Sequence, residues 1–317
     1  MTDTPLAAPA ELAARAAALA RRQWLVGVAL AAAAAVCFSL RPVLVKLAYR
    51  FMADPVTLLT LRMLLSLPFF VVAAIWHGRS RPQARLAAGD LAAVLVLGFL
   101  GYYLASYLDF LGLQYVSAGV GRLILFLYPT IVLLLSALLL RTRVRGSEVA
   151  ALALSYGGLA LVLLPEQTGG DADLPLGAAL VFASGVAYAL YLIGGNRVIG
   201  RLGSIRFSAL ATSVACLCCF IQFLALRPLA ALAQPFPVYA LSAVIAIVCT
   251  VVPIFMTSEA LRRIGAGNVA MINAIGPASA MAWGYVGLGE VMTAVQIGGA
   301  ALVLAGVLLV TWKPARG

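Results

Sequence analysis

The sequence predicts an all-α integral membrane protein whose ten transmembrane helices form two inverted five-helix repeats. The first observation is composition, because 64% of the 317 residues are hydrophobic and only 10% are charged. Soluble domains are about half apolar and about a quarter charged. Runs of roughly 20 apolar residues cross a bilayer as helices, which satisfy their own backbone hydrogen bonds. Loop charges and an internal duplication supply the other two observations.

Ten apolar runs, separated by charged or turn-forming residues, are candidates for these helices. We place them at 24–46, 55–76, 91–113, 119–140, 147–164, 176–195, 207–226, 238–261, 268–288 and 291–312. The Ala-rich segment 1–22 predicts a short amphipathic helix or a loose arm. Its pair of arginines resembles the start of a signal peptide, but no cleavage site leads into a soluble domain, so we expect an arm.

A duplicated unit runs through the chain. The stretch GLQYVSAGVGRLILFLYP returns 148 residues later as ALRRIGAGNVAMINAIGP, which places Gly119 on Gly267 and Pro129 on Pro277. Without gaps, 11 of 53 positions are identical from Gly112 onward. The duplication therefore rests on the positions of Gly and Pro.

Lysine and arginine residues indicate the orientation. Segments on the N-terminal side of the membrane hold 16 of the 22 basic residues, and the opposite loops hold only Arg50 and Arg227. This bias predicts that both termini are cytoplasmic. Since five helices are an odd number, the second copy must enter the membrane inverted. The predicted organisation is a cytoplasmic arm at 1–22, a first repeat at 23–164, an external loop at 165–175, a second repeat at 176–312 and a cytoplasmic tail at 313–317.

Several features together carry a resemblance to a known family. They are the small-residue turns before the fourth and ninth spans (SAG and GAG), the two mid-span prolines and the stretch LGEVMTAVQIGGAALVLAGVLL. Lys46 and Arg62 also match. The chain resembles the EamA-like branch of the drug/metabolite transporter superfamily over about residues 24–312. One position departs, because Glu290 of the second copy falls opposite Thr142. The resemblance implies a secondary transporter, and favours efflux. In transporters with inverted repeats the substrate site lies near the midplane.

Charged side chains inside spans are costly unless they are paired or face water, so they indicate candidate sites. Arg41 lies well inside the first span, and Lys46, Arg62 and Arg122, in the first, second and fourth spans, lie nearer the outer boundary of the membrane. Together they predict a cationic outer vestibule suited to a carboxylate. The alternative interpretation is ion pairing with acids such as Asp109 or Asp54.

Polar and aromatic residues supply further candidates. Tyr103 and Tyr107 are four residues apart and share a helix face. Ser184 and Tyr188 have the same spacing. Asn273 stands where the first copy has an apolar residue. Tyrosine combines an apolar ring with a hydroxyl and suits amphipathic metabolites. The predicted substrate-binding residues are Arg41, Tyr103, Tyr107, Arg122, Ser184, Tyr188 and Asn273.

The prolines Pro129 and Pro277 predict helix bends that face the central cavity and act in gating, since a proline removes a helical hydrogen bond. The alternative is a pair of tolerated kinks. Gly276, Ala280 and Gly284 form a small-residue face, which predicts helix packing or a dimer seam, so the chain is either a monomer or a homodimer.

Other classes of function lack a motif. The chain has one histidine, His77, and shows no metal-ligand cluster, paired carboxylates or nucleophile elbow. We therefore expect no enzyme activity, no metal, no cofactor and no nucleic-acid partner. The predicted function is alternating-access transport of a small metabolite, an amino acid or other carboxylate, across a bacterial-type inner membrane, with proton coupling left open. A membrane-embedded enzyme or a non-transporting scaffold is the alternative.

Overall fold

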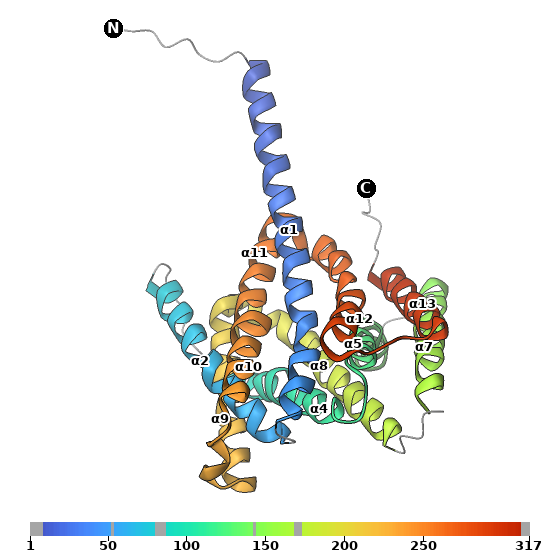
Figure 1. Ribbon diagram of the computed structural model, residues 1–317. Helices are drawn as coiled ribbons and strands as arrows, with labels where there is room; N and C mark the ends of the chain where they lie inside the picture. Colours follow the sequence, from blue (N-terminus) through green and yellow to red (C-terminus); the bar gives the residue numbers. More distant parts are fainter. Residues whose placement is uncertain (1–8, 52–53, 80–86, 142–143, 168–172, 312–317) are drawn as a thin grey trace.

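The computed structural model describes residues 9–51, 54–79, 87–141, 144–167 and 173–311, and these contain helices and no strand. The first half comprises α1 (Pro9–Tyr49), α2 (Pro55–Arg79), α3 (Ala88–Leu97), the π-helical η1 (Gly98–Leu104), α4 (Ala105–Gly112), α5 (Ala118–Phe126), α6 (Tyr128–Leu140) and α7 (Gly146–Gln167). The long α1 carries the described part of the N-terminal arm as a continuous helix, which projects beyond the bundle (Figure 1).

The second half follows the same order. It comprises α8 (Leu174–Leu202), α9 (Ser204–Leu226), the 3₁₀ helix η2 (Leu229–Leu232), α10 (Phe236–Ala246), the π-helical η3 (Ile247–Val251), α11 (Val252–Ile272), α12 (Ile275–Leu288) and α13 (Ala294–Thr311). Within α11, Gly265 has a φ of 77° and turns the chain between two spans. This is the first residue of the expected GAG turn, and glycine adopts a positive φ without steric cost.

Nine segments of the described chain are long and apolar enough to cross a membrane. The expected ninth span, 268–288, is not among them because the helix breaks between Ile272 and Ile275. This leaves α12 with 14 residues, or about 21 Å of helix at 1.5 Å per residue. The all-helical membrane architecture is confirmed, and the count of ten spans stays a prediction.

The packing of α7 against α13 demonstrates the inverted repeat. A Cβ added to Gly158 would lie 2.5 Å from the carbonyl oxygen of Gly299, and one added to Gly306 would lie 2.6 Å from that of Ala151. The offset of 148 residues converts the first contact into the second, because it carries Gly158 to Gly306 and Ala151 to Gly299. The higher-numbered residue of α7 meets the lower-numbered residue of α13. The two equivalent helices are therefore antiparallel and related by a pseudo-two-fold axis.

Two π-helical segments also obey the repeat. Adding 148 to the bounds of η1, Gly98–Leu104, gives 246–252, which encloses η3, Ile247–Val251. Each segment interrupts the third helix of its half. A π-helix inserts extra backbone into a helical turn and is found mostly near functional sites. Sequence periodicity gave no signal for either segment.

The matched prolines lie directly after helix breaks. Between α5 and α6, the amides of Leu127 and Thr130 bond to carbonyls three residues back, at 3.1 and 2.9 Å. Before Pro277, the amide of Gly276 bonds to the carbonyl of Asn273 at 2.9 Å. Proline has no amide hydrogen to continue the regular pattern, so the preceding turn tightens. A helix break therefore precedes each proline, and a role of these prolines in gating stays a prediction.

Candidate functional site

A cavity of about 380 Å³ lies between the two halves. Its volume is within the range of small-molecule sites. The residues that line it come from both repeats: Ala35, Phe38, Arg41, Arg62, Gly101, Tyr102, Ala105, Ser106, Arg122, Leu125, Phe126, Tyr128, Ser184, Tyr188, Tyr191, Ile254, Thr257, Ser258, Leu261 and Asn273. Two pairs of repeat-equivalent positions, Ser106 with Ile254 and Leu125 with Asn273, line it together. The cavity therefore lies at the pseudo-two-fold axis.

Three arginines reach the cavity from three helices. Arg41 extends from α1 and its Nη2 lies 2.7 Å from Oδ2 of Asp109, which is buried on α4. Arg62, on α2, is 2% exposed, donates to the hydroxyl of Ser106 at 3.0 Å and lies 5.1 Å over the ring of Phe110. Arg122 is on the first turns of α5. The expected pairing with Asp109 is thus found for Arg41, and the contacts of Arg62 are with uncharged groups.

Arg122 is the least compensated of the three. The structure gives its guanidinium no hydrogen bond or ion pair within the described residues, and its Nε is buried without a partner. A Cβ added to Gly276 would lie 3.4 Å from Nη2 of Arg122, so the guanidinium lies directly against α12. Nε of Arg41 and of Arg62 also lacks a partner. Buried cationic groups of this kind are stabilised when an anion binds.

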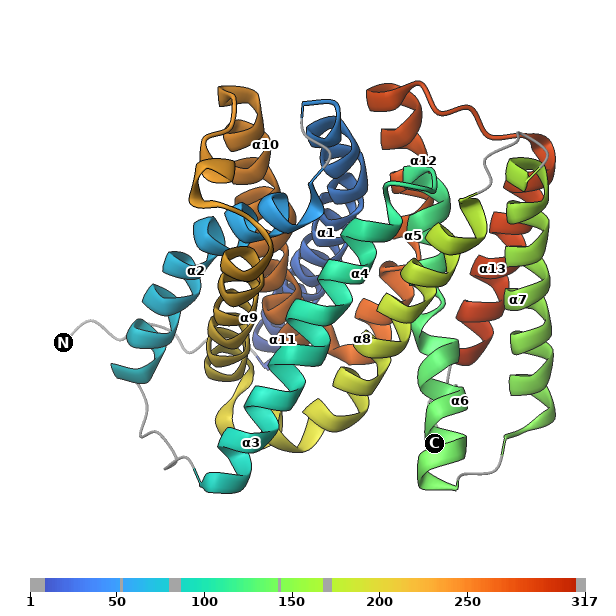
Figure 2. The ribbon, with the colours of Figure 1, turned by 90° about the horizontal axis from the view of Figure 1, so that it is seen from below.

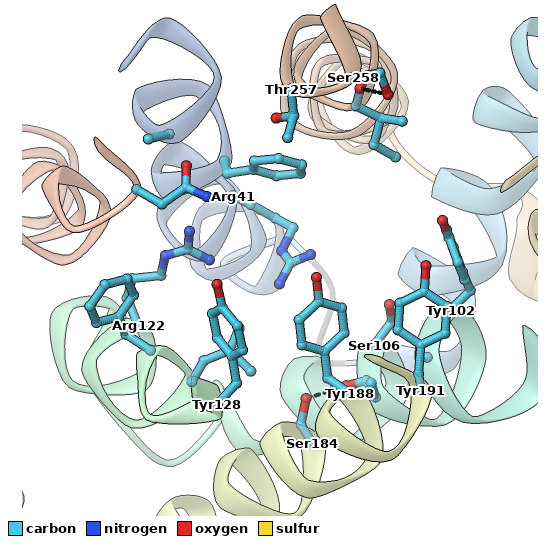
Figure 3. A pocket seen from close by; sticks show the side chains of 18 of the residues that line it. Arg41, Tyr102, Ser106, Arg122, Tyr128, Ser184, Tyr188, Tyr191, Thr257 and Ser258 are labelled. Atoms are coloured by element: carbon cyan, nitrogen blue, oxygen red, sulfur yellow. Dashed lines mark hydrogen bonds between the residues drawn. The ribbon is translucent and has the colours of Figure 1, made fainter. Parts of the chain in front are cut away.

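Aromatic rings form the wall facing these arginines. Tyr188 makes an edge contact with Tyr128 at 5.4 Å and stacks on Tyr191 at 5.6 Å between ring centroids. Figure 3 shows the guanidinium ends of Arg41 and Arg122 and the hydroxyl ends of Tyr128 and Tyr188 directed toward one space. The arrangement offers cationic and hydroxyl donors beside an apolar ring surface, which suits an amphipathic anion.

The structure brings five of the seven predicted binding residues together. Arg41, Arg122, Ser184, Tyr188 and Asn273 line the cavity. The hydroxyl of Ser184 is already engaged, because it donates to the carbonyl of Ala105 at 2.6 Å. Ser184 therefore joins α8 to α4 at the cavity wall.

The other two predicted residues lie elsewhere. Tyr103 and Tyr107 stack on each other with centroids 6.3 Å apart and pack against the main hydrophobic core. Tyr102, Ala105 and Ser106 occupy the cavity face of the same span. One residue further along a helix turns the side chain by about 100°, which takes Tyr103 and Tyr107 away from that face.

Several lining residues carried no signal in the sequence. Thr257 and Ser258 on α11 reach the cavity opposite the tyrosines, as Figure 3 shows. Their span is hydrophobic around most of its circumference, so periodicity does not identify the inward side. Ser106 could have been found through its position four residues after Tyr102, which shares its helix face.

Arg41 is the last residue of α1 that lines the cavity, and contacts further along α1 join this helix to neighbouring elements. About one turn further along α1, Nζ of Lys46 donates to the carbonyl of Val116 at 2.7 Å. About two turns along, the hydroxyl of Tyr49 donates to the carbonyl of Phe110 at 2.6 Å. Nearby, the carboxylate of Glu290 accepts from the amide of Ala118 at 2.9 Å. A carboxylate at a helix N-terminus satisfies free amides and interacts favourably with the helix dipole.

A further ion pair joins α2 to the end of α9 on this side. Nε of Arg227 lies 2.9 Å from Oδ2 of Asp54. Partial burial would raise the pKa of Asp54, but hydrogen bonds from Arg227 and Thr57 outweigh burial and hold that pKa below its ordinary value. Asp54 is therefore ionised at neutral pH, and its ion pair with Arg227 links the two halves.

Comparison with known proteins places the chain among transporters. The sequence profile of the EamA-like transporter family matches residues 25–164 and 175–312. The chain is 31% identical over 283 residues to "Uncharacterized transporter YcbK" of Bacillus subtilis, covering 86% of this chain and 89% of that protein. It is 23% identical over 243 residues to "Uncharacterized transporter YyaM" of the same organism, covering 75% and 78%.

The fold is similar to that of a solved crystal structure. The TM-score is 0.59 at 19% sequence identity, and the match covers 89% of this chain and 95% of the other. At this identity the likeness concerns the helix arrangement alone.

Proposed function

The chain belongs to the EamA-like transporter family, and we propose that it carries a small carboxylate-bearing metabolite, an amino acid or another carboxylate, outward across the inner membrane by alternating access. The observation that carries the proposal is the uncompensated guanidinium of Arg122 in a cavity between inverted repeats. A carboxylate, like a phosphate, pairs with a guanidinium in bidentate geometry. The aromatic wall would accept the remaining, less polar part.

The contacts beyond Arg41 support a proposal about how the cavity opens. Lys46, Tyr49 and Glu290 contact neighbouring elements beyond Arg41. With both termini cytoplasmic, this side is external, and these contacts would lie between the cavity and the exterior. Alternating access then requires these contacts to open while the inner side closes. The helix breaks before Pro129 and Pro277 are the proposed sites of bending.

The orientation is tested by labelling. In a background with the native cysteines replaced, Arg50→Cys should react with a membrane-impermeant maleimide added to intact cells, because Arg50 is exposed between α1 and α2. Protection in intact cells together with reaction after lysis contradicts the orientation.

Transport is tested in proteoliposomes with a panel of radiolabelled carboxylates, amines and neutral sugars, with and without a pH gradient. We expect flux of carboxylates, and a large loss in Arg122→Gln with no loss in Arg50→Gln. The control removes an exposed arginine outside the cavity. Failure to move any solute under any gradient argues for a scaffold. Chemical turnover without vectorial movement supports an enzyme, and flux of amines alone contradicts an anionic substrate.

A further inference from the structure

The cavity carries more positive charges than nearby carboxylates neutralise. Arg41, Arg62 and Arg122 line it, and none of the described lining residues is acidic. Asp109 compensates Arg41 from the adjoining α4. Three guanidinium groups therefore meet one carboxylate, which leaves two positive charges.

Four other described acids are occupied away from the cavity. Asp54 pairs with Arg227 and Asp90 with Arg201, while Glu259 bonds to the arginines that follow it on α11. Glu290 caps α5. None of these carboxylates is among the described residues that line the cavity. The missing negative charge must come from a ligand or from ions in solution.

Neutral contacts hold the two uncompensated arginines in place without cancelling their charge. Arg62 is directed by the hydroxyl of Ser106 and by the ring of Phe110. Arg122 lies against Gly276, where an added Cβ would be 3.4 Å from its Nη2, a van der Waals contact. Nε of each remains buried and unpartnered. A buried ionic group without a counter-charge carries a large desolvation cost, so both positions favour anions.

The two excess charges come from helices on opposite sides of α1. Arg62 belongs to α2 and Arg122 to α5, and these helices lie on either side of α1 in both ribbon views (Figures 1 and 2). Arg41 belongs to α1, the helix between them. A ligand whose two negative charges sit on separate groups therefore matches this arrangement better than a ligand with both charges on one phosphate.

We propose that the substrate is a small dicarboxylate, with one carboxylate held near Arg122 and Arg41 and the other toward Arg62. This inference rests on the proposed carboxylate transport and specifies its substrate class. The hydroxyls of Tyr128 and Tyr188, which point into the same space as Arg41 and Arg122, are additional donors to the first carboxylate (Figure 3). With both carboxylates bound, the cavity is close to electrically neutral.

The experiment compares succinate with its monoester, which carries one charge less, and with glycerol 3-phosphate, which carries its charge on a single phosphate. Purified protein in detergent is titrated with succinate, monomethyl succinate and glycerol 3-phosphate, and uptake of each is measured in proteoliposomes. We expect succinate to bind at least about tenfold more tightly than its monoester, equivalent to about 1.4 kcal/mol. Glycerol 3-phosphate carries both charges on one group and should bind more weakly than succinate.

Charge variants connect this preference to the arginines. Arg62→Gln should weaken succinate binding and leave monoester binding nearly unchanged, so that the preference is lost. Arg122→Gln should weaken binding of both ligands, because the carboxylate that they share lies near Arg122. Arg62→Lys and Arg122→Lys retain the charge and should retain most of the preference, and they replace the glutamine variants if those fail to fold. Arg50→Gln is the control outside the cavity.

The possible failures are distinguishable. Equal binding of succinate and its monoester, with carboxylate flux intact, overturns the dicarboxylate and leaves the proposed transport function in place. Tighter binding of glycerol 3-phosphate than of succinate overturns the separated-charge arrangement. Absence of flux for every solute refutes the transport function itself.

Discussion

The guanidinium of Arg41 and the carboxylate of Asp109 lie 2.7 Å apart and join α1 to α4 beside the cavity. Their side chains are 15% and 3% exposed, so the pair is largely removed from water. Such a pair orients Arg41 for a ligand and limits the positive charge of the empty cavity. It also makes Asp109 a sensitive position, because its removal leaves Arg41 with a buried, unpaired charge.

Asp109→Asn should lower the stability of the detergent-solubilised protein by on the order of 3 kcal/mol, because an uncompensated buried charge remains. The measurement is the thermal unfolding midpoint. Adding Arg41→Gln should recover part of the loss, since the two positions are coupled. Asp173→Asn, at an exposed residue whose side chain makes no capping bond, is the control and should have little effect. Additive losses in the double variant contradict an energetically coupled pair.

Gly158→Ala should destabilise the contact between α7 and α13 by about 1–3 kcal/mol, since its Cβ would lie 2.5 Å from the carbonyl of Gly299. The adjacent Gly157 offers a matched control, because a Cβ added there meets nothing within 4 Å. Gly157→Ala should be neutral or stabilising, as alanine favours helices. Thermal midpoints of the two variants test this, and equal midpoints would show that α7 and α13 are not closely packed.

The pair of Asp54 and Arg227 predicts a pH-dependent contribution to stability. The pKa of Asp54 is lowered in the folded protein, so its ionised form is favoured by folding. The contribution is present above the ordinary aspartate pKa of about 3.9 and is lost as the pH falls through the lowered value. The difference in thermal midpoint between wild type and Asp54→Asn should therefore be constant from about pH 7 to 5 and shrink toward pH 3. A difference that grows on acidification contradicts the pairing.

Pro277→Ala should slow transport more than it weakens substrate binding, because a regular helix would replace the break at Asn273 and Ala274. A rate loss on the order of tenfold corresponds to about 1.4 kcal/mol on the barrier. Initial uptake rates and equilibrium binding separate the two effects. Pro68→Ala, at an exposed proline inside α2, is the control. Equal rates in wild type and Pro277→Ala would support the alternative of a tolerated kink.

Much of the architecture was predictable because a bilayer imposes simple rules on sequence. Long apolar runs identified the helices, and the matched positions of glycine and proline identified the repeat before any contact was known. Gly158 and Gly306 meet backbone of the partner helix, which explains why glycine occurs at both. The break after Ile272 was harder to place, since proline indicates a bend nearby without fixing which residue leaves the helix.

The part of the candidate site that could be predicted consists of charged side chains, which are unfavourable in the hydrocarbon of a membrane. Arg41 and Arg122 stood out because charge is costly in hydrocarbon, and both reach the cavity. Tyr103 and Tyr107 do not reach the cavity. An aromatic residue packs in a hydrophobic core as well as in a cavity wall, so its presence in the sequence does not distinguish the two. The π-helical η1 lies in the same span, and its extra backbone changes the phase by which side chains face inward. No periodicity in the sequence reports that change.

The contact between α7 and α13 has a consequence for how the chain is assembled. Since Gly158 meets Gly299 and Gly306 meets Ala151, each half offers the other an equivalent surface at this seam. Such an isologous interface is self-complementary, as in a two-fold symmetric homodimer. Within this seam, recognition does not depend on the peptide connection between the halves. Each half carries there the surface needed to find an oppositely inserted copy of itself, which is the arrangement expected of two separate polypeptides joined end to end.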